Sequence, residues 1–238
     1  MVIYSIKSYL SLSLPRVYMK VLFVHAKSKA DILPILKKVK ISGRIGLVSN
    51  IQHLHKLEEA KKFLGEKAIV GGQILGCDVS SALRIKDKVD SYLYIGTGKF
   101  HPIGVALKTG KPVYIANPLT NEFSKVEEEQ IEQMRKETKG KYLKFLYAKK
   151  VGILLSIKPG QFHPKQYLDL NKKLDIAERI RKKYNKETYI FVFNTLNYNE
   201  LNNFPDIECW INTACPRIEY KNIIYIGDIN LQENEHKA

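Results

Sequence analysis

Residues 91 to 117 read SYLYIGTGKFHPIGVALKTGKPVYIAN, and this stretch contains the repeating unit of the fold. Its two ends, 91–96 and 112–117, are short runs of apolar and aromatic residues, as expected for strands buried on both faces of a parallel sheet. The segment 101–109 between them is predicted to be a helix. A strand, a crossover helix and a second strand together predict a right-handed βαβ unit.

The same alternation continues on both sides of this stretch. Toward the N-terminus, strands are predicted at 21–26, 44–50 and 67–72, and helices at 29–39, 51–64 and 78–85. Toward the C-terminus, strands are predicted at 151–157, 188–194, 209–214 and 222–227, and helices near 164–185 and 198–203. The sequence therefore predicts an α/β protein with two consecutive domains, each a parallel sheet flanked by helices.

A highly charged segment from Ser124 to about Lys150 is predicted to be the helix that joins the two halves. Ser124 and Glu127 have the spacing of a capping box at its start. With the boundary near residue 145, we expect an N-terminal extension at 1–19, one α/β domain at 20–145 and another at 146–238. Residues 1–18 superficially resemble a signal peptide, but Ser and Lys interrupt the apolar positions, so we interpret them as an extra strand or an over-long start.

The composition indicates a soluble protein with a basic surface. Lys and Arg number 39 against 24 Asp and Glu, which gives a formal net charge of +15. The lysines are scattered and no aromatic-basic RNA-binding motif accompanies them, so the charge belongs either to a solvated surface or to a docking site for an acidic partner. No run reaches the ~18 apolar residues of a membrane span. Three cysteines argue against a disulfide framework and for a reducing cytoplasm. We expect a cytoplasmic protein with no membrane and no specific nucleic-acid partner.

Four unusual loops each follow a predicted strand. They are Gly76-Cys77, GTGKFHPIG at 96–104, KPGQ at 158–161 and ACPR at 214–217. Ligands of open α/β sheets bind beyond the carboxyl ends of the strands, so we expect these loops to contribute to a shared site. The third glycine of GTGKFHPIG has the wrong offset for a dinucleotide fingerprint, which argues against a nicotinamide site.

The cysteines differ in their surroundings. Cys77 and Cys215 each stand alone, so they do not form a CxxC pair or a zinc finger, and each is either a small buried hydrophobe or a ligand. Cys209 lies six residues before Cys215 on the same predicted strand, a separation of ~20 Å at ~3.3 Å per residue. We therefore expect Cys209 to pack in the core.

Three polar residues in these loops have both a structural and a functional interpretation. His101, at the start of the predicted helix, either stabilises the loop or contacts a ligand. Gln161 and Arg217 are either neutral turn residues or part of a site, where Arg217 would bind a carboxylate in bidentate fashion.

Taken together, four motifs resemble the iron-sulfur diphthamide synthase family in order and spacing, from about residue 20 to 220. They are GQILGC (72–77), IGTGKFHPIGVALKTGKPV (95–113), KPGQ (158–161) and INTACPRI (211–218). The resemblance implies a 4Fe-4S cluster held by three cysteines, one from each of three homologous α/β domains, with an open iron that binds S-adenosylmethionine. It also implies the first step of diphthamide biosynthesis, in which a 3-amino-3-carboxypropyl radical is transferred to a histidine of elongation factor 2.

By this resemblance Cys77 and Cys215 are catalytic cluster ligands, and His101, Gln161 and Arg217 bind substrate. The family's first domain has no counterpart in the sequence, so we expect the third cysteine from a second chain or a full-length paralogue, in a homo- or heterodimer. The alternative is a non-catalytic shortened paralogue that assembles with a full-length synthase or passes electrons to it.

Overall fold

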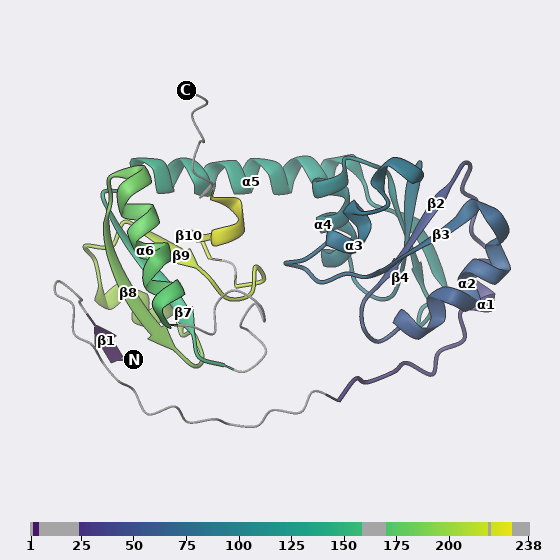
Figure 1. Cartoon of the computed structure of the whole chain (residues 1–238), viewed down its shortest axis with the longest axis horizontal. Coiled ribbons are helices and arrows are strands. Elements are labelled where there is room, and N and C mark those ends of the chain that lie inside the picture. Colours follow the sequence, from purple (N-terminus) through teal and green to yellow (C-terminus); the bar gives the residue numbers. More distant parts are fainter. Residues whose placement is uncertain (1, 5–23, 159–169, 219, 230–238) are drawn as a thin grey trace. The chain divides into compact units, whose positions relative to one another are not determined.

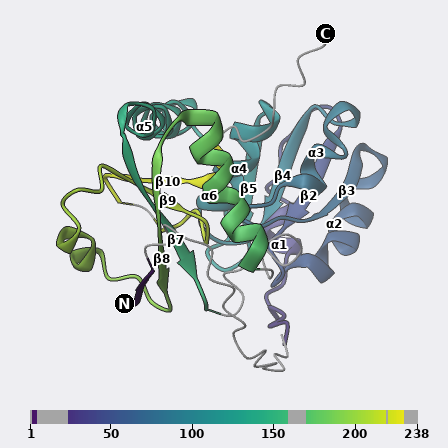
Figure 2. The same ribbon diagram turned by 60° about the vertical axis from the view of Figure 1, so that its left-hand side comes forward.

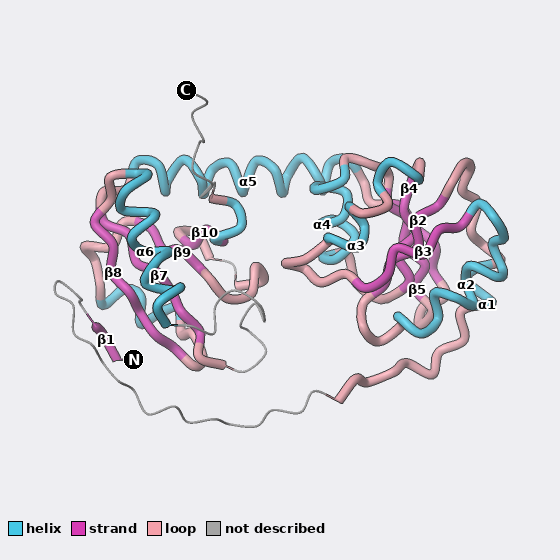
Figure 3. Tube along the Cα trace, in the orientation of Figure 1, coloured by secondary structure: helices cyan, strands magenta, loops and turns pink. Residues whose placement is uncertain are grey.

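The structure, a computed structural model, describes residues 2–4, 24–158, 170–218 and 220–229. It divides into two compact units: unit 1 comprises Met1–Val21 and Lys136–Ala238, and unit 2 comprises Leu22–Arg135. Strands alternate with helices in both units (Figure 3), and each unit contains one five-stranded sheet. The predicted α/β fold is confirmed, and both sheets are mostly parallel, although each has one antiparallel edge strand that a purely parallel sheet would lack.

Unit 2 is built on a sheet with the strand order β3-β2-β4-β5-β6. Its strands are β2 (Ile45–Ser49), β3 (Ala68–Gln73), β4 (Ser91–Ile95), β5 (Val113–Asn117) and β6 (Glu122–Lys125), and its helices are α1 (Leu33–Leu36), α2 (Leu57–Leu64), α3 (Ser80–Leu83) and α4 (Phe100–Thr109). The first four strands are parallel, whereas β6 pairs with β5 in antiparallel orientation. The carboxyl ends of β2, β3 and β4 therefore lie at one edge of this sheet.

The sheet of unit 2 is buried on both faces. Every residue of β4 is buried; Tyr92 and Tyr94 belong to the core with α3 and α4, and Leu93 and Ile95 to the core with α1 and α2. This two-sided burial is the reason that the strand sequence is apolar without alternation.

Unit 1 has a sheet with the strand order β1-β8-β7-β9-β10 (Figure 1). The strands are β1 (Val2–Tyr4), β7 (Lys150–Ser156), β8 (Glu187–Phe193), β9 (Cys209–Asn212) and β10 (Ile223–Tyr225), and the helices are the C-terminal part of α5 (Glu128–Tyr147) and α6 (Leu170–Tyr184). β7 to β10 are parallel, and β1 pairs with β8 in antiparallel orientation, so residues 2–4 form the extra strand that the sequence suggested. α6 lies across one face of the sheet (Figure 2), where Ile176 and Ile180 pack against β7.

The other face of the unit 1 sheet is covered by the segment between β8 and β9. It contains the 3-10 helix η4 (Tyr198–Asn203), and Leu201 packs there with Phe191 and Trp210. The sequence predicted a helix at 198–203, and the structure has this tighter form.

Four expectations about individual elements need correction. Residues 24–26 of the predicted strand 21–26 are not in a strand, and 21–23 lie outside the described residues. Val24 is 82% exposed, so no sheet covers its side chain. The capping box is wrong, because Ser124 lies in β6 and α5 begins only at Glu128. β6 itself was not predicted, because EFSK has only one large apolar residue. The helices predicted at 29–39 and 78–85 are α-helical only over the four residues of α1 and of α3.

The division between the units falls within α5, at Arg135 and Lys136. The boundary expected near residue 145 lies in the same helix. α5 has 20 residues and charged side chains along most of its length. Neither α5 nor any other described helix combines the length and the apolarity that crossing a bilayer requires.

Candidate functional site

Cys77 is exposed in a tight turn that follows β3. The turn is closed by two reciprocal backbone hydrogen bonds, in which the Leu75 N–H donates to the Asp78 carbonyl at 2.8 Å and the Asp78 N–H donates to the Leu75 carbonyl at 3.3 Å. One carboxylate oxygen of Asp78 accepts from the Ser80 N–H at 2.8 Å, which connects the turn to α3. The backbone thus holds Cys77 in a short, defined loop, and its exposure rules out a role as a core residue.

Gly76 brings this turn against the start of α4. A Cβ atom built on Gly76 would lie 2.0 Å from Cε1 and 2.8 Å from Cζ of Phe100, so only glycine fits beside this ring. Phe100 in turn contacts His101 edge to face, with ring centroids 5.7 Å apart. The structure therefore brings the Cys77 loop and the start of α4 together at one sheet edge, as the sequence predicted for these two loops.

His101 is the second residue of α4 and is half-buried. Its ring stacks on Tyr94 of β4, with centroids 5.9 Å apart and an angle of 16° between the planes. Burial raises the pKa of the Tyr94 hydroxyl to about 12, so this ring stays neutral at physiological pH. Gly98, before the helix, has a φ of +76°, a left-handed conformation that favours glycine. His101 is thus supported on two sides by aromatic rings.

Cys215 lies in unit 1, in the loop after β9, and is half-buried. The fully buried Asn212, the last residue of β9, organises this loop with its side chain. Its Oδ1 accepts from the Ala214 N–H at 2.9 Å, and its Nδ2 donates to the Cys215 carbonyl at 2.7 Å. The same carbonyl accepts from the Ile218 N–H at 2.9 Å. Cys215 is therefore held from both sides of its loop.

A further bond ties this loop to the neighbouring strand. The Thr213 N–H and hydroxyl both donate to the Leu154 carbonyl of β7, at 3.2 and 2.8 Å. Because β7 and β9 are parallel, the loops that follow them leave the same edge of the sheet. Arg217 is exposed two residues beyond Cys215. Of the predicted KPGQ loop only Lys158 is described, and Gln161 lies outside the described residues.

Cys209, unlike Cys77 and Cys215, is a core residue. It is the first residue of β9, is 1% exposed and packs within the core of unit 1. Burial raises the pKa of its thiol to about 11, although Lys186 and Lys144 act in the opposite direction. The expectation that Cys209 is a core residue is confirmed. β9 ends at Asn212, so Cys215 lies in a loop and not on the same strand.

The donor atoms of the two loops suit a soft metal centre that takes thiolates. Within the described residues, no three or more His, Cys, Asp or Glu side chains come together in a way that could hold a metal ion. Cys77 and Cys215 belong to different units, and each unit offers one accessible thiol beyond the carboxyl ends of its parallel strands.

Two residues of these loops were missed by sequence reasoning. Asn212 carried a weak signal, since asparagine at a strand end often hydrogen-bonds the backbone two residues later. Phe100 carried none, because its contact with Gly76 joins the Cys77 turn to the first residue of α4, and these segments are separate in sequence.

A family model for diphthamide synthesis proteins matches residues 7–224. The chain is 34% identical to the 2-(3-amino-3-carboxypropyl)histidine synthase of Pyrococcus horikoshii over 217 residues, which cover 83% of this chain and 58% of the relative. It is 28% identical to subunit 1 of the synthase of Schizosaccharomyces pombe, covering 84% of this chain and 48% of that subunit. The crystal structure of Dph2 from P. horikoshii with a 4Fe-4S cluster is similar, with a TM-score of 0.68 and 31% identity over 84% of this chain and 61% of that one. The chain thus spans about half the length of the curated relatives it matches.

Proposed function

The chain belongs to the diphthamide synthesis family, and from this premise we propose that it acts in the first step of diphthamide biosynthesis. The reaction would transfer a 3-amino-3-carboxypropyl group from S-adenosylmethionine to a histidine of elongation factor 2. The observation that carries the proposal is the placement of Cys77 and Cys215: both thiols are accessible, and each lies in a loop beyond the carboxyl ends of parallel strands.

We propose that each unit supplies one thiolate to a 4Fe-4S cluster. A bound cluster supplies the electron that cleaves the sulfonium of S-adenosylmethionine. The chain's own contribution is to hold the two thiols in place: the Leu75 and Asp78 bonds fix the turn around Cys77, and Asn212 fixes the loop around Cys215. Cys209 is unsuitable as the third ligand, because its side chain is 1% exposed and packs in the core of unit 1, where a cluster cannot reach the sulfur.

The substrate contacts proposed for this site are electrostatic and aromatic. The exposed guanidinium of Arg217 would bind the carboxylate of the amino-acid part of the substrate, a geometry that favours arginine over lysine. His101 would line the pocket from its stacked position on Tyr94. Gln161 stays a proposed contact.

The third thiolate would come from a second chain or from a full-length paralogue. This proposal makes the functional unit a dimer, with elongation factor 2 as its protein substrate. A reducing compartment such as the cytoplasm would keep the three thiols available.

Anaerobic reconstitution with iron and sulfide tests the proposal. We expect a mixture of the chain with the archaeal synthase to bind iron and sulfide at the chain's own thiols and to cleave S-adenosylmethionine. The synthase in such a mixture should be a variant with its own cluster ligands replaced at the positions that correspond to Cys77 and Cys215, so that its activity depends on this chain. Cys77→Ala and Cys215→Ala in the chain should each abolish cleavage.

Cys209→Ala is the matched control, because it removes a thiol of the same chemistry from the core. It should leave the iron content and the cleavage unchanged. Iron binding that persists in the Cys77→Ala/Cys215→Ala double variant, or that is lost in Cys209→Ala with the fold intact, would refute the assignment. The synthase name of the relatives favours this function over the alternative of a non-catalytic supporting subunit.

A further inference from the structure

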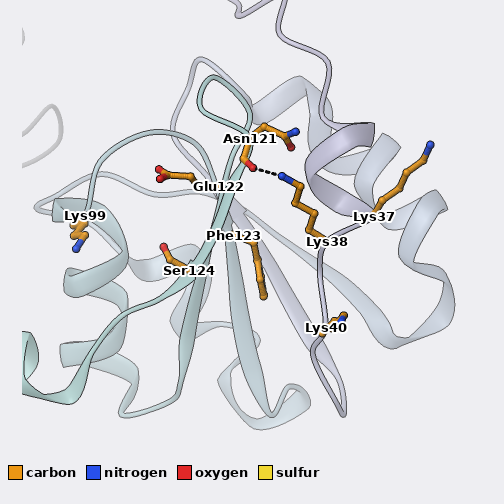
Figure 4. Close-up of a pocket in the computed structure, with 8 residues that line it drawn as sticks. All are labelled: Lys37, Lys38, Lys40, Lys99, Asn121, Glu122, Phe123 and Ser124. Atoms are coloured by element: carbon orange, nitrogen blue, oxygen red, sulfur yellow. Dashed lines mark hydrogen bonds between the residues drawn. The ribbon is translucent and has the colours of Figure 1, made fainter.

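Strand β6 forms one edge of the unit 2 sheet, and lysines surround it. A surface hollow of about 830 Å³ lies along this edge (Figure 4). The residues that line it are Lys37, Lys38, Lys40, Lys99, Asn121, Glu122, Phe123 and Ser124. Figure 4 shows Lys99 on one side of β6 and the other three lysines on the opposite side. An occupant of the hollow would therefore meet positive charge along both faces of the strand.

These lysines are exposed, and their charge is largely unbalanced. Among the described residues, no carboxylate forms an ion pair with any of the four. Lys38 donates to the Asn121 carbonyl at 2.7 Å, which fixes the position of its ammonium group beside the strand without neutralising it. Glu122, the one carboxylate of the lining, accepts from the Thr120 hydroxyl at 3.0 Å. The surface thus matches a ligand of several negative charges.

The backbone of β6 offers a second recognition element. β6 pairs with β5 in the register Ile115↔Ser124, and the Val126 N–H donates to the Val113 carbonyl at 2.9 Å. In an antiparallel pair the backbone groups of alternate residues point away from the partner strand. Those of Phe123 and Lys125 therefore point outward, and no hydrogen bond to them is found within the described part of the chain. A second extended chain can pair with this edge.

The side chains favour a peptide over a nucleic acid. Base stacking on a single strand uses exposed aromatic faces. The ring of Phe123 stacks on Tyr114, with centroids 5.7 Å apart and an angle of 5°, and it packs against the core that includes α1. The ring is therefore engaged within the protein, whereas the strand edge is open.

We propose that β6 and the lysine-lined hollow form a docking site for an acidic, extended segment of a partner protein, which adds to the sheet as a sixth strand. The positive charge discriminates between partners, because a second copy of the lysine-flanked strand is repelled and an acidic strand is attracted. This inference goes beyond the proposed function and does not depend on the cluster, since every residue that carries it lies in unit 2.

The test uses the full chain and a synthetic eight-residue peptide of alternating Glu and Thr, with blocked ends. We expect saturable binding that weakens with added salt, and slower amide exchange at Phe123 and Lys125, whose N–H groups become hydrogen-bonded in the complex. Lys37→Gln/Lys40→Gln should weaken binding by about twofold to thirtyfold, because each of the two exposed charges contributes about 0.2–1 kcal/mol. Lys61→Gln/Lys62→Gln on α2 removes the same charge elsewhere in the unit and should have little effect.

Blocking the edge gives an independent measurement. Lys125→Pro removes one outward N–H, a substitution that edge strands accept, and we expect it to weaken binding more than Lys125→Gln. Several results would overturn the proposal: peptide binding without protection of the Phe123 and Lys125 amides, equal binding of a peptide with Lys in place of Glu, or equal loss of affinity in both double-lysine variants. A single-stranded oligothymidylate of matched charge that binds more tightly to the same residues would overturn it in favour of a nucleic-acid site.

Discussion

Gly76→Ala tests whether the Cys77 turn depends on the Phe100 ring. The added methyl group would lie 2.0, 2.8 and 3.0 Å from three atoms of the ring, where ordinary contacts begin at about 3.5 Å. Because three atoms of the ring are too close to the added methyl group, a small rotation of the ring that moves only one of them away does not relieve the clash. Either the whole ring of Phe100 or the turn itself has to shift.

The cost of this shift follows from the geometry. Overpacking by one methyl group in a well-packed region typically costs about 1–3 kcal/mol. Phe100 is partly exposed, so the ring has some freedom to move and the lower half of that range applies. We expect the two hydrogen bonds that close the turn, between Leu75 and Asp78, to open about 5-fold to 30-fold more often, because 1.4 kcal/mol corresponds to a factor of ten.

Amide hydrogen exchange is the appropriate assay, because Trp210 is the single tryptophan of the chain and its fluorescence reports on unit 1. Exchange of the Leu75 and Asp78 amides should accelerate in Gly76→Ala, and the added substitution Phe100→Ala should restore it. Gly104→Ala is the control: it lies within α4 with no neighbouring atom near the new methyl group, so it should stabilise the unit by about 0.5–1 kcal/mol. Unchanged exchange in Gly76→Ala, or no recovery with Phe100→Ala, would contradict the reasoning.

Three further predictions concern single side chains. Asn212→Leu removes both side-chain hydrogen bonds to the Cys215 loop and leaves the Ala214 N–H without its acceptor. We expect the free energy of unfolding of unit 1 to fall by about 1–3 kcal/mol, as measured by Trp210 fluorescence in urea. Lys186→Met removes the buried ammonium that donates to two carbonyls at the end of α5, at 2.9 and 2.6 Å. The free energy of unfolding of unit 1, measured in the same way, should fall by about 1–3 kcal/mol. Lys182→Met, on an exposed side chain, is the control and should lower it by less than about 0.5 kcal/mol. Burial raises the pKa of Tyr94 from about 10 in the unfolded chain to about 12 in the fold. Its contribution to the free energy of unfolding is therefore complete below about pH 10 and falls, by on the order of 3 kcal/mol, as pH rises to about 12. Tyr94→Phe should remove this part of the decline in urea unfolding followed by circular dichroism.

The sequence predicted the buried strands well because burial on both faces leaves a direct signature. SYLYI of β4 is apolar at every position but the first, and both faces of the strand meet a helical layer. The edge strand β6 has no such signature, because EFSK is mostly polar and its pairing depends on β5 rather than on its own residues. Residues 24–26, the described part of the strand predicted at 21–26, show the converse, because apolar side chains do not by themselves supply a neighbouring strand.

For the candidate site, the sequence predicted which loops lie at the carboxyl ends of strands but not the contacts within them. The rule that ligands bind beyond the carboxyl ends of parallel strands selected the loops of Cys77, His101 and Cys215 from the order of elements alone. The stacking of His101 on Tyr94 and the bonds from Asn212 to the Cys215 loop depend on side-chain geometry, which periodicity does not contain.

The three cysteines show how position in the fold determines the chemistry of one residue type. Cys209 lies within a strand, where its neighbours are apolar and burial raises the pKa of the thiol to about 11. Cys77 is exposed and Cys215 is half-buried, and both lie in loops beyond strand ends whose backbone is hydrogen-bonded. A cysteine can bind a metal only where the metal reaches its sulfur and the backbone keeps the sulfur in a fixed position. Cys209 is 1% exposed and does not meet the first condition, whereas hydrogen-bonded loops hold Cys77 and Cys215 outside the core, which is the reason that these two are the proposed ligands.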